Sequence, residues 1–332
     1  MNYADRLVRY ENLVPCLNAF IDTRTPGSEK KENFTVIGPG VSENPDQHVH
    51  IGIPHGFNIG GARQPPGCLN SQHSHLTSEV FLVHSGTWAF RSGARATDGE
   101  IILREGDVIS LPTNIFRGFE NIGEDTGYLF AILGGDDPGR VLWAPDVFDL
   151  AEEYGLILLE DGSLVDTTLG QEVPIEKSPM PRTTREQVDQ HQIVSSQDMP
   201  GIVIHSPDYA WSSDTALSRF VGVQEAPLLG PANEAESIAA GTLNWPHEFV
   251  FRALRLDPGA KIPPHRRSEE EVIFVLKGEL GMCVDREKLT LGPGDTFTTP
   301  IDSERLFWND GQQACDIYVT RRGNQPTEPN FS

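Results

Sequence analysis

Two blocks of residues recur in the same order in the two halves of this 332-residue chain. Each block keeps a constant offset between its copies, 192 residues for the first block and 188 for the second. An ordered repeat of this kind predicts a duplicated domain, because each copy must fold into the same unit. The repeated positions are Gly67, His73, His75, Glu79, Gly86, Gly106, Pro112, Arg117 and Asn121, and their counterparts are Gly259, His265, Arg267, Glu271, Gly278, Gly294, Pro300, Arg305 and Asn309.

The segments around these blocks have the pattern of short β-strands. Runs such as EVFLVHSGTWAF, EIILREGDVISL and EVIFVLKGELGM are apolar or alternate in polarity, and Gly, Pro, Asp and Asn separate them at short intervals. That pattern is typical of a β-sandwich or a β-barrel. A chain of this length can bury two cores. We therefore expect an all-β protein with two barrels.

Few segments have a helical pattern. We expect helices over Tyr3–Phe20 and Asp146–Tyr154, and a short one from Thr183, where Thr183 and Glu186 have the spacing of a capping box. Residues 171–184 contain three prolines and few apolar residues, which favours a linker. The predicted organisation is an N-terminal domain at 1–170, a linker at 171–184 and a C-terminal domain at 185–332.

The first copy of the repeat resembles the two sequence motifs of the cupin superfamily. Residues 67–86 fit the opening motif, G-x5-H-x-H-x3-E-x6-G, without a gap. Residues 106–121 fit the second motif, G-x5-P-x-G-x2-H-x3-N, with two exceptions. Asn114 stands where glycine is usual, and Arg117 stands where the fourth ligand histidine is usual.

The second copy, at 259–278 and 294–309, departs further from these motifs. His265 keeps the first histidine position, whereas Arg267 and Arg305 stand at the other two positions where histidine is usual. Two copies in one chain resemble a bicupin. The resemblance implies two jelly-roll (double-stranded β-helix) barrels with a few short helices. It implies no single reaction, because the superfamily includes oxygenases, decarboxylases, isomerases, lyases, storage proteins and sensors.

His73, His75 and Glu79 are the candidate metal ligands. Their even spacing allows them to face one side of a strand, since side chains alternate across it. Two imidazoles and one carboxylate with open positions form the arrangement that non-haem Fe(II) oxygenases use. We expect one divalent transition metal per chain, with Fe(II) favoured and Zn, Mn, Ni or Co also suitable. The alternative is a polar interior in which Glu79 pairs with Arg117 and no metal binds.

Arg117 cannot replace the missing histidine as a ligand, because a protonated guanidinium has no lone pair to donate. Its planar fork can instead hold a carboxylate or an enolate. We therefore expect Arg117 to anchor an acidic substrate beside the metal. The alternatives are a salt bridge between Arg117 and Glu79, or an outward-facing side chain.

The second copy is not expected to hold a metal. His265 and Glu271 remain, but Arg267 and Arg305 bring two fixed positive charges to the same pocket, which repel a divalent ion. This half is expected to brace the fold or to bind a small anion.

Other histidines are less informative. His48 and His50 share strand parity and could join the first site, although a pair at a strand end is more often surface chemistry. His84 has the opposite parity to Glu79 and is expected to lie away from the metal.

The overall charge of the chain disfavours two classes of binding partner. A formal net charge of −22 disfavours nucleic acid and anionic membrane surfaces, both of which recruit basic residues. No apolar run reaches the roughly 18 residues of a membrane span, and the N-terminus lacks the apolar core of a signal peptide. A cytoplasmic location is therefore expected.

The strand at 79–85 is apolar on both faces, so its outer face requires cover from the other domain or from another copy of the chain. We expect a homo-oligomer.

The predicted function is that of a metal-dependent oxygenase or dioxygenase acting on a small acidic or enolic compound. In size and duplication the chain resembles ring-cleaving bicupin dioxygenases of the gentisate or quercetin kind. A lyase, decarboxylase or isomerase that uses the metal as a Lewis acid is compatible with the same residues. A non-catalytic bicupin that binds a small anion is the third possibility.

Overall fold

The computed structural model describes residues 3–331, which form two compact units. The unit that we call the N-terminal barrel consists of Val14–Ile53 and Asn58–His205. The C-terminal barrel consists of the described residues up to Leu13, Pro54–Phe57 and the residues from Ser206 onward. The segment predicted as a linker, 171–184, lies within the N-terminal barrel.

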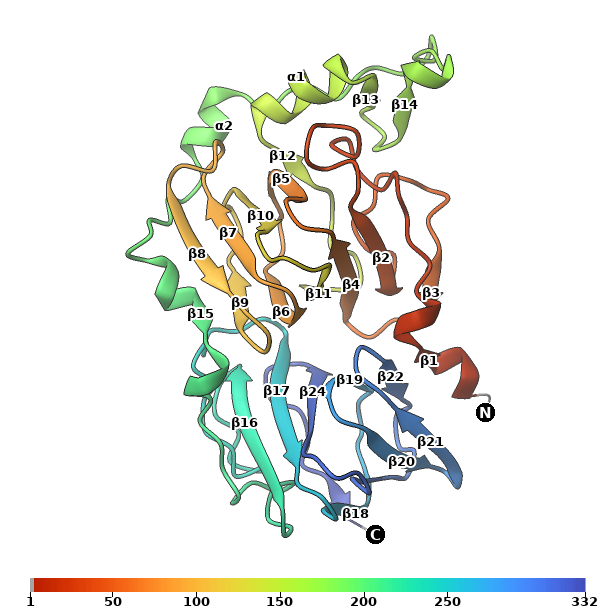
Figure 1. Ribbon diagram of the computed structural model, residues 1–332, viewed down its shortest axis with the longest axis vertical. Helices are drawn as coiled ribbons and strands as arrows, with labels where there is room; N and C mark the ends of the chain where they lie inside the picture. Colours follow the sequence, from red (N-terminus) through yellow and green to blue (C-terminus); the bar gives the residue numbers. More distant parts are fainter. Residues whose placement is uncertain (1–2, 332) are drawn as a thin grey trace. The chain divides into compact units, whose positions relative to one another are not determined.

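The N-terminal barrel is built from two sheets and a few short additional elements (Figure 1). Its larger sheet contains β2 (Glu32–Ile37), β3 (Val49–Ile51), β4 (Phe57–Gln64), β6 (Glu79–Ser85), β9 (Val108–Leu111), β11 (Gly127–Gly134) and β15 (Val203–Ile204). Its smaller sheet contains β5 (Leu69–Ser74), β7 (Trp88–Ser92), β8 (Gly99–Leu103), β10 (Arg117–Asn121) and β12 (Leu142–Trp143). The additional elements are α1 (Pro145–Glu153), the hairpin β13 (Leu156–Leu158) and β14 (Leu164–Asp166), and α2 (Arg185–Asp189).

The C-terminal barrel also consists of two sheets. The larger contains β1 (Leu7–Val8), β16 (Val223–Leu229), β17 (Phe249–Leu256), β19 (Glu271–Lys277), β22 (Thr296–Thr299) and β24 (Cys315–Arg322). The smaller contains β18 (Lys261–Arg266), β20 (Leu280–Val284), β21 (Glu287–Leu291), β23 (Arg305–Trp308) and β25 (Asn330–Phe331). Short 3₁₀ turns in the chain are Tyr3–Arg6, Tyr10–Asn12, Thr167–Leu169, Met199–Ile202 and Ser206–Asp208.

The strand order of the two barrels confirms the predicted duplication. In the larger sheets, β9-β6-β11-β4-β2 corresponds to β22-β19-β24-β17-β16, and in the smaller sheets β5-β10-β7-β8 corresponds to β18-β23-β20-β21. In each barrel a two-residue strand extends the same edge, β15 beside β9 and β1 beside β22. The expected all-β fold with two jelly-roll barrels is therefore confirmed.

A glycine repeated in both motifs closes an equivalent turn in each barrel. Gly86 and Gly278 have φ angles of 90° and 78°, a region that L-residues with a side chain rarely adopt. Space is also limiting, because a Cβ atom on Gly86 would lie 2.8 Å from the Cα atom of Gly127. On Gly278 it would lie 2.7 Å from the carbonyl oxygen of Ala314. These glycines of the repeat therefore serve the fold.

The repeated asparagine has an equivalent structural role. Asn121 Nδ2 donates to the carbonyl oxygens of Gln64 and Asp125, each at 2.8 Å. Asn309 Nδ2 makes the matching bonds, to Leu256 and Gln313, also at 2.8 Å. Each asparagine is fully buried and ties the end of one strand to the following turn.

The core of the N-terminal barrel lies between its two sheets. Aromatic rings dominate it: Phe81, Phe90 and Phe119 contact one another with ring centroids 5.2–5.4 Å apart. Trp88 packs against Phe119 at 5.8 Å. A second apolar cluster surrounds the buried Trp143 and includes one face of α1. These two clusters enclose the region that contains His73, His75 and Glu79.

The predicted helices are only partly confirmed. The helix expected over Asp146–Tyr154 is α1. The helix expected over Tyr3–Phe20 is wrong, because this segment forms two 3₁₀ turns and β1, whose residues pair with the edge strand β22. Tertiary pairing overrides local propensity here, and Pro15 could not continue a helix. Among residues 3–331, no helix is both long and apolar enough to cross a membrane.

The third predicted helix is present but is displaced by one position. Thr184, not Thr183, is the N-cap of α2, and Gln187 completes the capping box. The hydroxyl of Thr183 is buried and donates to the carbonyl oxygen of Trp143 at 2.6 Å. The capping prediction was shifted because two adjacent threonines each have an acidic or amide residue three positions later.

Candidate metal centre

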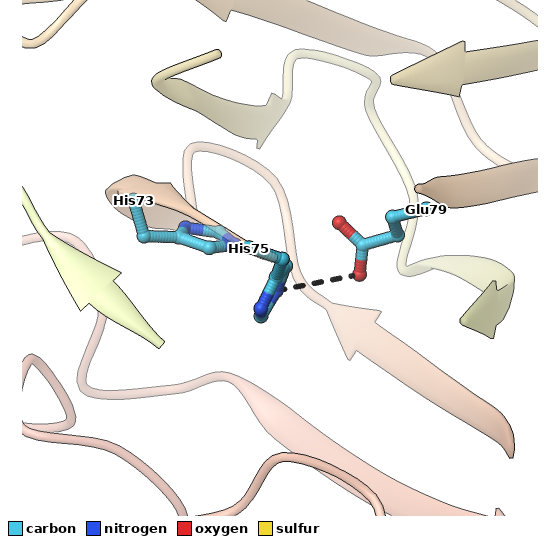
Figure 2. A group of neighbouring side chains, drawn as sticks. All are labelled: His73, His75 and Glu79. Atoms are coloured by element: carbon cyan, nitrogen blue, oxygen red, sulfur yellow. Dashed lines mark ion pairs between the residues drawn. The ribbon is translucent and has the colours of Figure 1, made fainter. Parts of the chain in front are cut away.

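His73, His75 and Glu79 meet in the interior of the N-terminal barrel (Figure 2). His73 lies near the end of β5, His75 lies in the turn that follows, and Glu79 begins β6. Each residue offers one potential ligand atom, and these atoms lie within 4.8 Å of one another. The three side chains are between 3% and 5% exposed. Among residues 3–331, this is the only such group of three or more His, Cys, Asp or Glu side chains.

Both imidazoles are in the form that a metal requires. His73 Nδ1 lies 2.7 Å from the carbonyl oxygen of Ser71, so this nitrogen carries the proton and Nε2 keeps its lone pair. Burial, with a further contribution from Arg117, lowers the pKa of His73 to about 3. The same causes hold the pKa of His75 well below its ordinary value. Neutral imidazoles are ligands for divalent transition metals.

Glu79 divides its two carboxylate oxygens between two neighbours. Oε2 accepts a hydrogen bond from Arg117 Nη2 at 2.7 Å, and Oε1 lies 3.9 Å from His75 Nε2 (Figure 2). Burial raises the pKa of Glu79, and the Arg117 guanidinium acts against that shift. One oxygen can therefore serve as a metal ligand while the other keeps its ion pair. The residues present thus fit a divalent ion.

Arg117 is fully buried and begins β10, where it pairs in register with His73 of β5. Its Nη1 donates to the main-chain carbonyl of His73 at 3.2 Å, in addition to the ion pair with Glu79. Of the two alternatives to a substrate anchor, the structure contains the salt bridge. Anchoring of a substrate by Arg117 remains a prediction.

A buried ion pair between Lys31 and Asp22 contacts β5, the strand that carries His73. Lys31 Nζ contacts Asp22 Oδ1 and donates to Asn70 Oδ1 at 3.0 Å, and both members of the pair are fully buried. Asp22 Oδ2 accepts from the main-chain N–H of Ser71 at 3.0 Å. Because the Ser71 carbonyl orients His73, this pair fixes the main chain that sets the imidazole in place.

Trp143 forms the wall next to His73, and Glu43 is hydrogen-bonded to Trp143. The Trp143 ring lies 5.4 Å from the His73 ring, and its Nε1–H donates to Glu43 Oε1 at 2.6 Å. Glu43 Oε2 accepts from the main-chain N–H of Ile21 at 2.7 Å. Burial raises the pKa of Glu43 to about 8. Both residues lie outside the repeated motifs, so no pattern in the sequence marks these roles.

A cavity of about 70 Å³ adjoins the candidate metal ligands. His73, His75 and Glu79 line it together with apolar side chains that include Phe81 and Phe119. Arg117 is not among the lining residues. The cavity can therefore hold a small molecule in contact with the candidate ligands.

The equivalent region of the C-terminal barrel is arranged differently. His265 Nδ1 donates to the carbonyl oxygen of Pro263 at 3.0 Å, as His73 does to Ser71. Glu271, however, faces two arginines, with Arg267 Nε at 3.5 Å and Arg305 Nη1 at 3.4 Å. Fixed positive charge therefore occupies the positions of two of the usual ligands, as the sequence predicts.

A loop carboxylate joins this arginine cluster. Glu236 pairs with Arg252 at 2.6 Å, Arg267 at 2.5 Å and Arg321 at 2.8 Å, and all four side chains are at most 3% exposed. Glu236 lies in a segment without a motif, so no pattern in the sequence marks it. No divalent-ion site of three His or acidic groups occurs here among the described residues.

The remaining histidines do not join the candidate centre. His50 is held by the Thr35 carbonyl at Nδ1, 2.7 Å away, and by the Val14 N–H at Nε2, 3.0 Å away. His48 packs against His50 with ring centroids 4.5 Å apart. His84 contacts the ring of Tyr128 and lies outside the metal-ligand group, as expected.

Comparison with known proteins agrees with the fold. Residues 253–321 match the cupin domain family. The structure of Lactobacillus farciminis oxalate decarboxylase in a formate complex is similar, with 12% identity and a TM-score of 0.58 over 98% of this chain and 88% of that chain. A mutant of Bacillus subtilis oxalate decarboxylase has 11% identity and a TM-score of 0.56, over 97% of this chain and 78% of that chain. At these identities the likeness shows the fold alone.

Two further matches are more limited. AerE from Microcystis aeruginosa has 13% identity and a TM-score of 0.50, over 95% of this chain and 98% of that chain. Endoribonuclease YbeY from Myxococcus xanthus is 32% identical over 83 residues, which are 25% of this chain and 28% of that protein. The shared part is thus under a third of that relative.

Two barrels with the same strand order, the repeated motifs and the matching domain family lead to one conclusion. The chain has the two-barrel fold of a bicupin, and its residues 253–321 match the cupin domain family.

Proposed function

We propose that this bicupin is a metal-dependent enzyme that acts on a small acidic or enolic compound in its N-terminal barrel. The observation that carries the proposal is the buried group of His73, His75 and Glu79 beside a cavity. A divalent transition ion held by two imidazoles and one carboxylate keeps open positions, and supplies Lewis-acid or oxygen chemistry there.

The chain's own residues prepare the site for a charged ligand. His73 and His75 are held neutral, and the Ser71 carbonyl fixes the orientation of His73. Arg117 holds one oxygen of Glu79 in place and leaves the other facing His75. Buried apolar walls keep water away from the bound compound, which strengthens each electrostatic contact.

Arg117 as a substrate anchor is part of this proposal. Its Nη1 and Nη2 atoms are engaged, whereas its Nε is buried without a hydrogen-bond partner. Anchoring requires the guanidinium to release Glu79 in part when an acidic compound enters. Before such a compound enters, the ion pair with Arg117 orients Glu79.

For the reaction class we propose oxygenation with Fe(II), since two histidines and one carboxylate are the ligand set of non-haem iron oxygenases. Decarboxylation is the second candidate. The observation that favours it is the similarity in fold to proteins named oxalate decarboxylases. Mn(II) is the metal to test for that reaction, because carboxylate and imidazole ligands also suit it.

Two parallel assays test the proposal. Protein loaded with Fe(II) or Mn(II) is given a panel of small oxo acids, enols and dihydroxyaromatic acids, while oxygen uptake and carbon dioxide release are recorded. Oxygen uptake with Fe(II) identifies an oxygenase, and oxygen-independent carbon dioxide release with Mn(II) identifies a decarboxylase. His73→Ala should abolish either activity, whereas His265→Ala, at the equivalent position of the other barrel, should retain it. Absence of metal uptake would refute the proposal.

A further inference from the structure

Strand register places a second layer of side chains next to the candidate ligands. Glu79 and Phe81 share one face of β6, because side chains alternate along a strand. Across the sheet, Leu133 of β11 pairs with Glu79, and Ala131 pairs with Phe81. The ring of Phe119 from β10 meets that of Phe81 at 5.2 Å. All five side chains line the cavity.

The second layer forms an apolar end of the cavity. Phe81, Ala131 and Phe119 belong to the main apolar core of this barrel, and each is at most 6% exposed. Ligand atoms that reach this end would exchange water for hydrocarbon contacts, a gain of about fourfold in affinity per buried methylene. The volume of about 70 Å³ limits their number. It is roughly half of the 150 Å³ cavity that accepts benzene.

The rest of the lining offers little to a second charged group. Of the described residues that line the cavity, none is lysine or arginine, and Glu79 is the only acidic one. The nearest cations, Arg117 and Lys31, are each paired with a carboxylate.

Three polar side chains of the cavity wall, Thr35, Gln47 and Asn58, are already hydrogen-bonded. Thr35 is hydrogen-bonded to Gln47, whose Nε2 donates to Pro39. Asn58 accepts from the Gly40 N–H at 2.9 Å and donates to the Gly135 carbonyl at 2.7 Å. A polar tail beside Thr35, Gln47 and Asn58 would therefore lose water without gaining equivalent partners. Asn33 is the exception, because it lines the cavity and its Nδ2 is buried without a hydrogen-bond partner.

We infer that the ligand of this site is a short-chain compound with one acidic, chelating head and an uncharged aliphatic tail of about two or three carbons. The head lies at the layer of His73, His75 and Glu79, and the tail lies against Phe81, Ala131 and Phe119. This inference rests on the proposed function, because it takes the metal site as the place of the head group. It distinguishes the expected substrate from a compact dicarboxylate without a tail.

A series of 2-oxo acids tests the tail. Protein loaded with Mn(II) is titrated calorimetrically with pyruvate, 2-oxobutyrate, 2-oxovalerate and phenylpyruvate, which share one head group. Affinity should rise about fourfold per methylene up to 2-oxovalerate and fall for the bulkier phenylpyruvate. Hydroxypyruvate replaces the terminal methyl group of 2-oxobutyrate by a hydroxyl group. It should bind about tenfold more weakly than 2-oxobutyrate.

Two phenylalanine variants provide a matched pair. Phe119→Leu enlarges the cavity and should improve phenylpyruvate binding relative to pyruvate by about tenfold. Phe90→Leu removes the same atoms from a ring that packs on Phe119 at 5.4 Å but does not line the cavity, and it should leave the ranking unchanged. Both variants lose core packing, so a change in the ligand ranking that occurs only in Phe119→Leu comes from the enlarged cavity.

The outcomes separate the two proposals. If the protein takes up Mn(II) but binds all tails equally, or prefers hydroxypyruvate, the inferred tail is wrong and the metal site stands. If it takes up no metal, the proposed function fails and the series cannot bind through a chelate. A ranking that changes equally in Phe90→Leu would also overturn the assignment of the tail to Phe119.

Discussion

Arg117 Nη2 lies 2.7 Å from Glu79 Oε2, whereas the repeated pair, Arg305 and Glu271, is separated by 3.4 Å. The closer pair lies in the barrel that keeps both histidines, and the looser one lies where Arg267 also contacts Glu271. The repeated position thus carries arginine in both barrels, but the carboxylate has a single cationic partner in the N-terminal barrel. Only there is a carboxylate oxygen left to face a histidine.

Replacing Arg117 should change metal binding. In Arg117→Met the buried Glu79 loses its cation, so the metal-free protein should be destabilised by about 3–5 kcal/mol. A divalent ion then meets less positive charge, and its affinity should rise by about tenfold or more. Metal titration and thermal unfolding with and without the ion measure both effects. Arg305→Met is the control in the other barrel and should not alter metal content.

The same variant tests the substrate anchor. If Arg117 holds the acidic head of a ligand, Arg117→Met should weaken anionic ligands by roughly tenfold to a hundredfold. Equal loss for anionic and neutral ligands would exclude that role. Arg117→His would add an imidazole as a fourth ligand, so metal affinity should rise while activity falls, since one open position is lost.

Metal stoichiometry should distinguish the two barrels. We expect about one transition metal per chain, because only one barrel keeps His, His and Glu together. His75→Ala should lose that metal, whereas Arg267→Ala, at the repeated position, should keep it. Elemental analysis of gently purified wild type and both variants makes the comparison. Two equivalents in the wild type would show that the arginine-rich barrel also holds an ion.

The sequence was sufficient for the barrels because their determinants are local and repeated. Gly86 and Gly278 adopt a positive φ, and Asn121 and Asn309 each bond two equivalent carbonyls of their own barrel. These motif positions therefore indicate the fold directly. The set His73, His75 and Glu79 was predicted from alternation along one strand, but the structure divides it among β5, the following turn and β6. That the C-terminal barrel binds no metal stays a prediction, which rests on the positive charges of Arg267 and Arg305.

Other features depend on contacts between residues far apart in the chain. Leu7 and Val8 look helical in isolation, yet they complete the edge of β22, almost 290 residues later. Glu43 meets Trp143, and Glu236 meets Arg321, without any spacing that marks the pairs. No period in the sequence records such contacts, so the wall of the cavity and the arginine cluster became visible only in the structure.

Glu43 should make stability depend on pH. Its pKa rises from the ordinary value of 4.5 to about 8 through burial, so the folded protein holds a proton that the unfolded chain releases. Stability from this group is fully present below pH 4.5 and falls as pH rises toward 8, by at most about 1.4 kcal/mol per pH unit. Glu43→Gln removes the titrating carboxyl group, so the free energy of unfolding should change less with pH. Denaturant unfolding of both proteins between pH 5 and 8 gives the difference, and identical slopes would refute the assignment.

Glu236 should behave as an internal ligand of the arginine cluster. Burial acts to raise its pKa, but Arg321, Arg267 and Arg252 outweigh it and lower the pKa to about 2, so this stabilisation is present above pH 4.5 and is lost as pH falls toward 2. In Glu236→Ala the three arginines lose their shared carboxylate, and the free energy of unfolding should fall by about 3–5 kcal/mol.

Small carboxylates supply the test of that role. Acetate should bind in the space left by Glu236→Ala and raise its melting temperature with increasing concentration, since a ligand of the folded state stabilises by mass action. Ethylammonium, of similar size and opposite charge, should have no such effect. Glu234→Ala removes an exposed carboxylate from the same loop and should neither destabilise the protein nor respond to acetate. If acetate stabilises Glu236→Ala no more than the wild type, the arginines are held by contacts other than the Glu236 carboxylate.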